Sequence, residues 1–200
     1  MNTKTDKDDR LVLDLLEAVG KQNDVSQRYL ANQMGVALGL ANSYLKRCIH
    51  KGWIKINQAP ANRFLYYLTP TGFAEKSRLT AEYLTDSFQF YRRAGESCAQ
   101  LYAHCENNGW RQVILCGCSD LAEIAVLRAQ EMSVEVLGIY DPGASMTRLA
   151  GRPVWKKFSD LPRFDVCILT DVATPARSLE QLVKQVDRER ILVPDILRLG

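Results

Sequence analysis

The sequence predicts three parts: an N-terminal α+β domain, a long connecting helix, and a C-terminal α/β domain with a parallel sheet. Three observations lead to this division. Before residue 52, apolar side chains recur at helical spacing in short segments, and a hairpin pattern follows. A second helical pattern continues from residue 70 almost to residue 110. Beyond it, short apolar runs alternate with helical segments, as in βαβ units. We therefore expect domains at residues 1–70, 71–110 and 111–200.

The composition is typical of a globular protein, with 46% hydrophobic and 24% charged residues. No apolar run approaches the ~20 residues that are needed to span a bilayer. The N-terminus, MNTKTDKDDR, is polar and has no apolar stretch like that of a secretory signal. We therefore expect a cytoplasmic protein without membrane association.

Six cysteines and two histidines, His50 and His104, lack the spacing of a metal site. We expect free thiols, as is usual in a reducing cytoplasm, and no bound metal. Oxidation of Cys116 and Cys118 as a regulatory signal is an alternative. The position of Cys118 at the N-terminus of an expected helix slightly favours this oxidation. No basic residue flanks the two cysteines to lower a thiol pKa, which counts against it.

Charge is distributed unevenly along the chain, although the overall net charge is only +3. Residues 26–79 carry eight basic side chains and one acidic side chain, Glu75, which is a net charge of +7. Residues 113–200 are nearly neutral, at −1. A basic block beside a neutral one indicates a nucleic-acid-binding module joined to a second module.

The basic block begins with a helix-turn-helix pattern. A helix over residues 10–19 is followed by one that starts at the N-cap Ser26 and stops at Gly35, and then by one over residues 38–51. Polar side chains gather on the face of the third helix opposite its apolar face. These, with two residues that open the second helix, are the candidate DNA contacts: Gln27, Arg28, Asn42, Ser43, Lys46 and Arg47.

Two segments rich in aromatic and β-branched residues, 53–56 and 64–69, flank the polar turn 57–63. This pattern predicts a β-hairpin. Beside a helix-turn-helix, such a hairpin is the wing of a winged helix, and its tip places Asn62 and Arg63 near phosphates or the minor groove. The N-terminal part is therefore predicted to be an α+β winged helix-turn-helix domain that binds double-stranded DNA.

Two stretches of this part, MGVALGLANSYLKRCIHKGWIK and YYLTPTGFAEKSRLTAEYL, resemble the MarR-type winged-helix transcriptional regulators, and in particular a short group associated with exopolysaccharide genes. The resemblance implies a DNA-binding regulator. Leu40 occupies a position that is often basic in that group, so the operator sequence does not carry over.

From Pro70 the pattern predicts a helix of about 35 residues, which Asn108 and Gly109 end and which would span ~50 Å. It carries more apolar side chains than one small domain needs. We expect this helix to form a homodimer and so to set the distance between two recognition helices. The alternative is a helix that packs only across its own domains.

The C-terminal part predicts a Rossmann-like domain, with strands at 113–117, 134–140, 152–155, 165–171 and 190–194. Between the first two strands lies the degenerate glycine motif Gly117 to Ala122, where helix N–H groups would receive a phosphate. An acid after the second strand typically accepts from ribose hydroxyls. The candidate ligand contacts are Gly117, Cys118, Ser119, Asp120, Leu121, Asp141, Thr170 and Asp171.

The segments GCSDLAEIA and GIYDP, with GRPV, DVCILTD and TP after them, resemble the N-terminal Rossmann-like domain of pilin-glycosylation-type sugar acyltransferases. The resemblance implies a nucleotide-sugar site with Gly117, Ser119 and Asp141 as contacts. The catalytic β-helix of that family is absent from this sequence.

Together these patterns predict a ligand-responsive transcriptional regulator with a nucleotide-type ligand, which could be a nucleotide-sugar or NAD(H), and no covalent cofactor. A redox-sensing repressor that binds NAD(H) is one alternative, and a small nucleotide-dependent enzyme is another. Residues 113–200 contain no histidine and no Tyr-x-x-x-Lys pair, and we expect no substrate domain. We therefore expect that the chain is not an enzyme.

Overall fold

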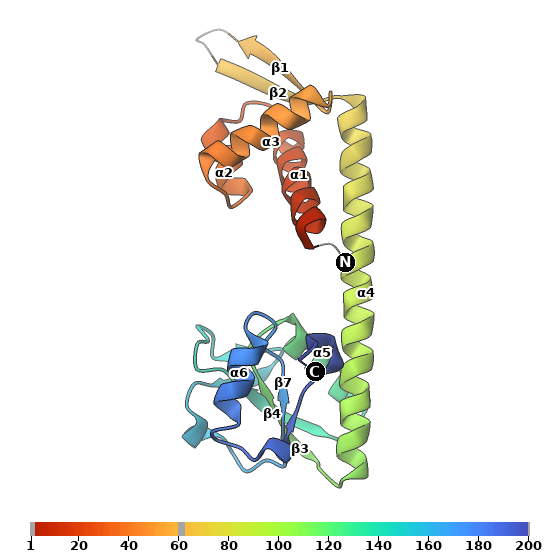
Figure 1. The fold of residues 1–200 in the computed structure, drawn as a ribbon, viewed down its shortest axis with the longest axis vertical. Coiled ribbons are helices and arrows are strands. Elements are labelled where there is room, and N and C mark those ends of the chain that lie inside the picture. Colours follow the sequence, from red (N-terminus) through yellow and green to blue (C-terminus); the bar gives the residue numbers. More distant parts are fainter. Residues whose placement is uncertain (1–2, 60–62, 200) are drawn as a thin grey trace. The chain divides into compact units, whose positions relative to one another are not determined.

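The computed structural model describes residues 3–59 and 63–199 (Figure 1). The chain forms two compact units, and the division lies between Ser87 and Phe88. The helix α4 (Pro70–Asn107) contributes its first turns to the first unit and its later turns to the second. In the described ranges, no helix is long and apolar enough to cross a membrane.

The first unit is a winged helix-turn-helix domain. It contains α1 (Thr3–Lys21), α2 (Gln27–Gln33), α3 (Leu38–His50) and the antiparallel strands β1 (Ile54–Ala59) and β2 (Arg63–Leu68). As expected, Ser26 caps α2, because its hydroxyl accepts a hydrogen bond from the N–H of Tyr29 at 3.1 Å. Gly35 adopts a φ of +62°, the left-handed conformation that lets the chain turn between α2 and α3.

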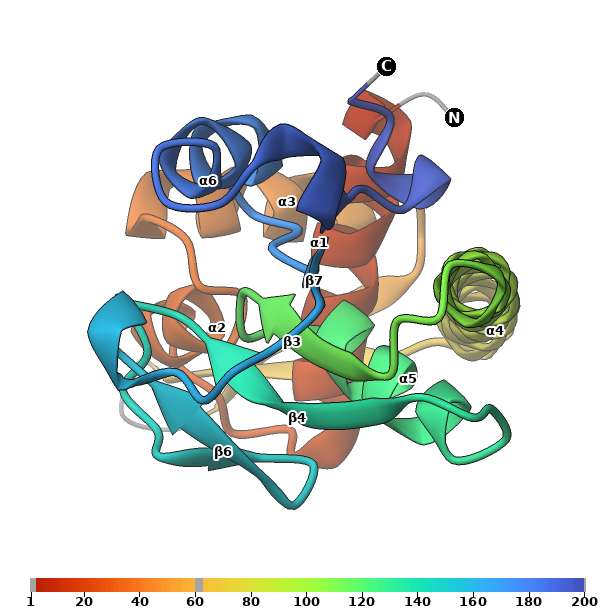
Figure 2. The same cartoon turned by 90° about the horizontal axis from the view of Figure 1, so that it is seen from below.

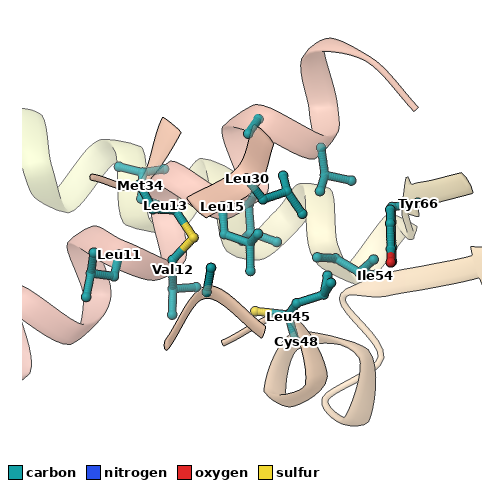
Figure 3. Close-up of a cluster of buried hydrophobic side chains, with 14 of the residues drawn as sticks. Leu11, Val12, Leu13, Leu15, Leu30, Met34, Leu45, Cys48, Ile54 and Tyr66 are labelled. Atoms are coloured by element: carbon teal, nitrogen blue, oxygen red, sulfur yellow. The ribbon is translucent and has the colours of Figure 1, made fainter. Parts of the chain in front are cut away.

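The core of this unit joins the three helices to the hairpin (Figure 3). Leu15 and Leu16 of α1 are fully buried, and Leu30, Leu45 and Ile54 pack into the same cluster. The hairpin is thus held against the helices at its base. This burial fixes the face of α3 that points away from the core.

The second unit has a Rossmann-like fold. Its strands are β3 (Gln112–Cys116), β4 (Glu135–Tyr140), β5 (Arg148–Leu149), β6 (Arg152–Trp155), β7 (Val166–Leu169) and β8 (Ile191–Leu192). Their order in the sheet is β5-β6-β4-β3-β7-β8, and every pairing is parallel except that of β5 with β6. The strands β6, β4, β3 and β7 can be followed in this order in Figure 2.

Helices cover both faces of this sheet. The later turns of α4 and the helix α5 (Asp120–Ala129) pack on one face through Cys98, Tyr102 and Ala125. The helix α6 (Pro175–Leu182) packs on the other face through Leu182, beside Cys116 and Cys167. Short 3₁₀ helices occupy Phe158–Asp160, Arg188–Arg190 and Asp195–Leu197.

The fold class is the one that the sequence predicts, and the differences lie at the ends of elements. The strand expected at 165–171 ends at Leu169, because Thr170 and Asp171 turn toward β3 and donate their N–H groups to the carbonyl of Cys116. The short strand β5 has no counterpart in the prediction, since two residues are too few to show a pattern.

Candidate functional site

The outer face of α3 is the candidate nucleic-acid interface. Gly39, Ser43, Lys46 and His50 follow one another at helical spacing and are all exposed, whereas Ala41, Leu45 and Cys48 are buried on the opposite face. A Cβ atom built on Gly39 would meet nothing within 4 Å. The exposed face therefore has small side chains near its N-terminal end and a cation in its middle.

Arg47, another predicted DNA contact, is engaged within the protein. Its guanidinium contacts Asp8 of α1 through two nitrogens, with Nη1 donating to Oδ1 at 3.2 Å and Nη2 at 2.9 Å from Oδ2. The guanidinium also lies over the ring of Tyr44, 4.5 Å from its centroid, and the hydroxyl of Tyr44 donates to the same carboxylate. Arg47 thus connects α3 to α1 in this structure.

This network favours the ionised carboxylate. Partial burial opposes the charge of Asp8, but the hydrogen bonds from Arg47 and Tyr44 outweigh it and hold the pKa of Asp8 below its ordinary value. The hydrogen bond to Asp8 likewise raises the pKa of Arg47. The separation of 39 residues between the partners explains why the sequence pattern did not reveal the pair.

The other predicted DNA contacts lie in different surroundings. Gln27 and Arg28 are exposed in the first turn of α2. Asn42 is half-buried, and its Oδ1 is a buried atom without a hydrogen-bond partner. The backbone of Arg63 pairs with Ala59 in the hairpin, and Asn62 lies outside the described residues.

In the second unit, a cavity of about 270 Å³ opens at the carboxyl ends of β3, β4 and β7. This edge is where the connections from neighbouring strands diverge, which is the usual ligand position in open α/β sheets. Three of the residues that the sequence analysis names as candidate ligand contacts line this cavity, namely Gly117, Asp141 and Asp171. The side of the cavity formed by α6 was not predicted, and it contributes Arg177, Ser178 and Gln181.

Gly117 is required by the turn after β3. Its φ is +111°, and a Cβ atom there would lie 2.5 Å from the backbone nitrogen of Asp171. The N–H of Gly117 donates to the carbonyl of Tyr140 at 2.9 Å. The next N–H, of Cys118, donates to Oδ2 of Asp141 at 2.9 Å. The glycine turn is therefore bonded to the end of β4.

Four other predicted ligand contacts lie outside the cavity. The hydroxyl of Ser119 donates to the carbonyl of Thr170 at 2.5 Å and accepts from the N–H of Ala122, so it caps α5. The buried Thr170 donates its hydroxyl to the carbonyl of Gly117 at 2.7 Å. Leu121 is fully buried, and Asp120 is exposed in the first turn of α5. None of these four residues lines the cavity.

The two acids at the cavity differ in how far their oxygens are occupied. Asp171 accepts from the N–H groups of Ala173 and Thr174 and from the hydroxyls of Thr174 and Ser178. Burial raises its pKa, but these bonds outweigh burial and keep the pKa below the ordinary value. Asp141 accepts two bonds, from the N–H groups of Cys118 and Gly143. Asp141 therefore keeps more acceptor capacity.

All six cysteines are free in the structure. Burial raises the pKa of Cys118 to about 11, and the adjacent Asp141 adds to this shift. The neighbouring thiol of Cys167, together with burial, holds the pKa of Cys116 well above its ordinary value. Both thiols are therefore protonated near neutral pH, which argues against a thiolate-based redox signal at these positions.

Comparisons with known proteins identify the first unit. Residues 8–55 match the model of a family described as winged helix-turn-helix DNA-binding. A search of curated proteins found no match. Among solved structures, human N-acetylserotonin methyltransferase in complex with SAM matches at 14% identity and a TM-score of 0.35, over 94% of this chain and 75% of the other. PigF with SAH matches at 15% identity and a TM-score of 0.25, over 96% and 56%.

One prediction has to be corrected in light of these comparisons. The expectation that the chain is not an enzyme is contradicted by the match to a methyltransferase in complex with SAM. The lack of a histidine and of a Tyr-x-x-x-Lys pair in residues 113–200 was too narrow a criterion, because it considered only some reaction types. Neither structure assigns an activity or a ligand to this chain, because both TM-scores are below 0.5. The N-terminal unit is, by fold and by family match, a winged helix-turn-helix domain.

Proposed function

We propose that the protein is a ligand-responsive transcriptional regulator, which binds duplex DNA through α3 and the β1–β2 wing and a nucleotide-type small molecule in the second unit. The exposed polar face of α3 within a winged helix-turn-helix is the observation that carries this proposal. Such a helix lies in the major groove, where Ser43 and Lys46 would reach base edges and phosphates. The net charge of +7 over residues 26–79 adds attraction to the DNA backbone.

Binding to duplex DNA tests this proposal directly. We expect the full chain to bind random 30-base-pair duplexes weakly, and a sequence selected from that pool tightly, as measured by fluorescence anisotropy. Because phosphate contacts release counterions, affinity for both should fall steeply as salt increases from about 50 to 200 mM. Absence of binding at the lowest salt concentration, together with failure of the selection to enrich any sequence, would contradict a role in DNA binding.

The cavity beside Gly117 supports the ligand-binding part of the proposal. It lies at the strand ends where open α/β sheets bind ligands, and it combines backbone, carboxylate and guanidinium groups. A ligand alters DNA affinity only if it binds more tightly to one arrangement of the protein than to another. We therefore propose that ligand binding in the second unit changes the population of DNA-binding arrangements.

We further propose that the protein is a homodimer formed through α4. Every residue from Ala81 to Arg93 is exposed, including Leu84 (45%), Phe88 (59%) and Tyr91 (41%). These three residues continue, at alternating steps of four and three, into residues of α4 that are buried in the second unit, namely Gly95, Cys98, Tyr102 and Cys105. The exposed part of this seam, at Leu84, Phe88 and Tyr91, has the spacing that packs well against the same residues of a second helix. A dimer would also match the two-fold symmetry of many operators.

Phe88→Glu tests the dimer. We expect this change to shift the protein from dimer to monomer in sedimentation velocity, because a carboxylate in the seam would have to be buried without a partner. Gln89→Glu is the matched control, since it adds the same charge to the neighbouring exposed residue, one position off the seam. A wild-type protein that sediments as a monomer at micromolar concentration would contradict the dimer, as would an unchanged Phe88→Glu dimer.

A further inference from the structure

The position of the cavity relative to the two helices that begin near it is informative. Gly117 lines the cavity, but Ser119, Asp120 and Leu121, which open α5, do not. The opposite side is formed by α6, from Thr174, Arg177 and Ser178 at its start to Gln181 and Leu182 at its end. A ligand in this cavity therefore contacts the N-terminal end of α6 rather than that of α5.

Arg177 gives this end of α6 a positive charge. Among the described residues it has no ion pair, and its exposed side chain is one of those that line the cavity. Pro175 occupies the first turn, and the first N–H of α6 with a backbone acceptor is that of Ser178, which donates to Thr174. The preceding N–H groups of Ala176 and Arg177 are thus free for an anion, and the helix dipole favours one there.

Of the residues that the structure describes, neither of the two acids that line the cavity forms an ion pair with Arg177, so its positive charge is available to a ligand. Asp171 already accepts four hydrogen bonds from its own loop and helix, so its lone pairs are satisfied. Asp141 accepts two backbone N–H groups and can still accept a hydroxyl. Of the charged groups that line the cavity, Asp141 at the end of β4 remains as an acceptor and Arg177 at the start of α6 remains as a cation, beside uncharged polar side chains such as that of Gln181. This combination suits a molecule that carries hydroxyls and an anionic group.

We infer that Arg177, at the first turn of α6, binds the phosphate of a ligand that is a phosphomonoester no larger than a mononucleotide, with a ligand hydroxyl on Asp141. The inference rests on the proposed ligand site and makes it specific. The volume of about 270 Å³ is just below the range of ~300–1,000 Å³ that holds drug-sized ligands, and a dinucleotide would extend far outside it. The phosphate site lies at α6, while the glycine turn serves to hold the strand ends together.

Isothermal titration calorimetry on the full chain tests the inference with four kinds of probe: nucleoside monophosphates, sugar monophosphates, inorganic phosphate and NAD(H). We expect one class of monophosphate to bind most tightly. Arg177→Gln should weaken that binding about tenfold or more, because the guanidinium supplies charge-assisted hydrogen bonds. Arg163→Gln is the matched control, since Arg163 is exposed and does not line the cavity. Asp120→Asn removes a negative charge from the first turn of α5 and should leave the affinity unchanged.

The outcomes separate this inference from the proposed function. Full affinity in Arg177→Gln, with tighter binding in Asp120→Asn, would place the phosphate at α5 and overturn the inference while a nucleotide ligand remained. Preference for NAD(H) over every monophosphate would overturn the size limit. Inorganic phosphate could instead bind as tightly as any organic monophosphate and lose affinity in Arg177→Gln. That result would support the anion site and would identify free phosphate as the ligand. If no probe bound, both the inference and the proposed ligand class would fall.

Discussion

Gly117→Ala is expected to destabilise the second unit by about 2–4 kcal/mol, because the added methyl group both strains the backbone and overlaps a neighbouring loop. The φ of +111° is unfavourable for any residue with a Cβ atom. That Cβ would lie 2.5 Å from the nitrogen and 2.6 Å from the Cα of Asp171, and a backbone cannot rotate away as a side chain can. Relief of the overlap would have to move the loop after β7 and the start of α6.

Hydrogen exchange measures this effect for each unit separately, which matters because a chain with two units need not unfold in one step. Amides of β3 and β7 should exchange faster in Gly117→Ala, whereas those of α1 and α3 should not change. Gly143→Ala is the control, since Gly143 also lines the cavity and its added Cβ would come no closer than 3.5 Å to Oδ1 of Asp141. Equal protection of β3 in Gly117→Ala and the wild type would contradict the role given to this glycine.

The two units show which features a sequence can reveal. The apolar spacing of α1, the cap at Ser26 and the glycine turns at Gly35 and Gly117 depend on residues that are near one another in the chain, and local pattern was sufficient to predict them. The parallel arrangement of the strands followed from the alternation of strands and helices, since parallel strands need crossover connections.

The parts of the sites that were missed depend on contacts between distant segments. The glycine motif correctly indicated a sharp turn, but not that Ser119 and Thr170 would bond to the protein itself. Arg177 was not predicted as a ligand contact, because its place in the cavity lining depends on how α6 packs on the sheet. For the same reason, the polar pattern of α3 could not show that Arg47 would bind Asp8 of α1. Spacing predicts the face of a helix, but it does not predict the partner that a side chain on that face finds.

Lys46→Ala is expected to weaken duplex binding about tenfold to a hundredfold, with no change in the stability of the first unit, if α3 is the recognition helix. Lys46 is exposed in the middle of the outer face, so its loss removes a DNA contact without disturbing packing. The slope of log affinity against log salt should decrease in magnitude by about 0.9, the change expected for one phosphate contact. Lys21→Ala is the control, because it removes the same charge from the exposed end of α1.

Arg47→Ala should differ from Lys46→Ala in a way that follows from the bond to Asp8. Removal of Arg47 leaves the carboxylate of Asp8 and the hydroxyl of Tyr44 without the guanidinium that joins α1 to α3. We therefore expect lower stability of the first unit as well as weaker DNA binding, and the released carboxylate should repel phosphate. Asp8→Asn separates the loss of the ion pair from the repulsion of phosphate, because it removes both the ion pair and the negative charge. DNA affinity in Asp8→Asn should therefore be higher than in Arg47→Ala. Unchanged anisotropy curves for Lys46→Ala and Arg47→Ala alike would remove α3 from the DNA interface.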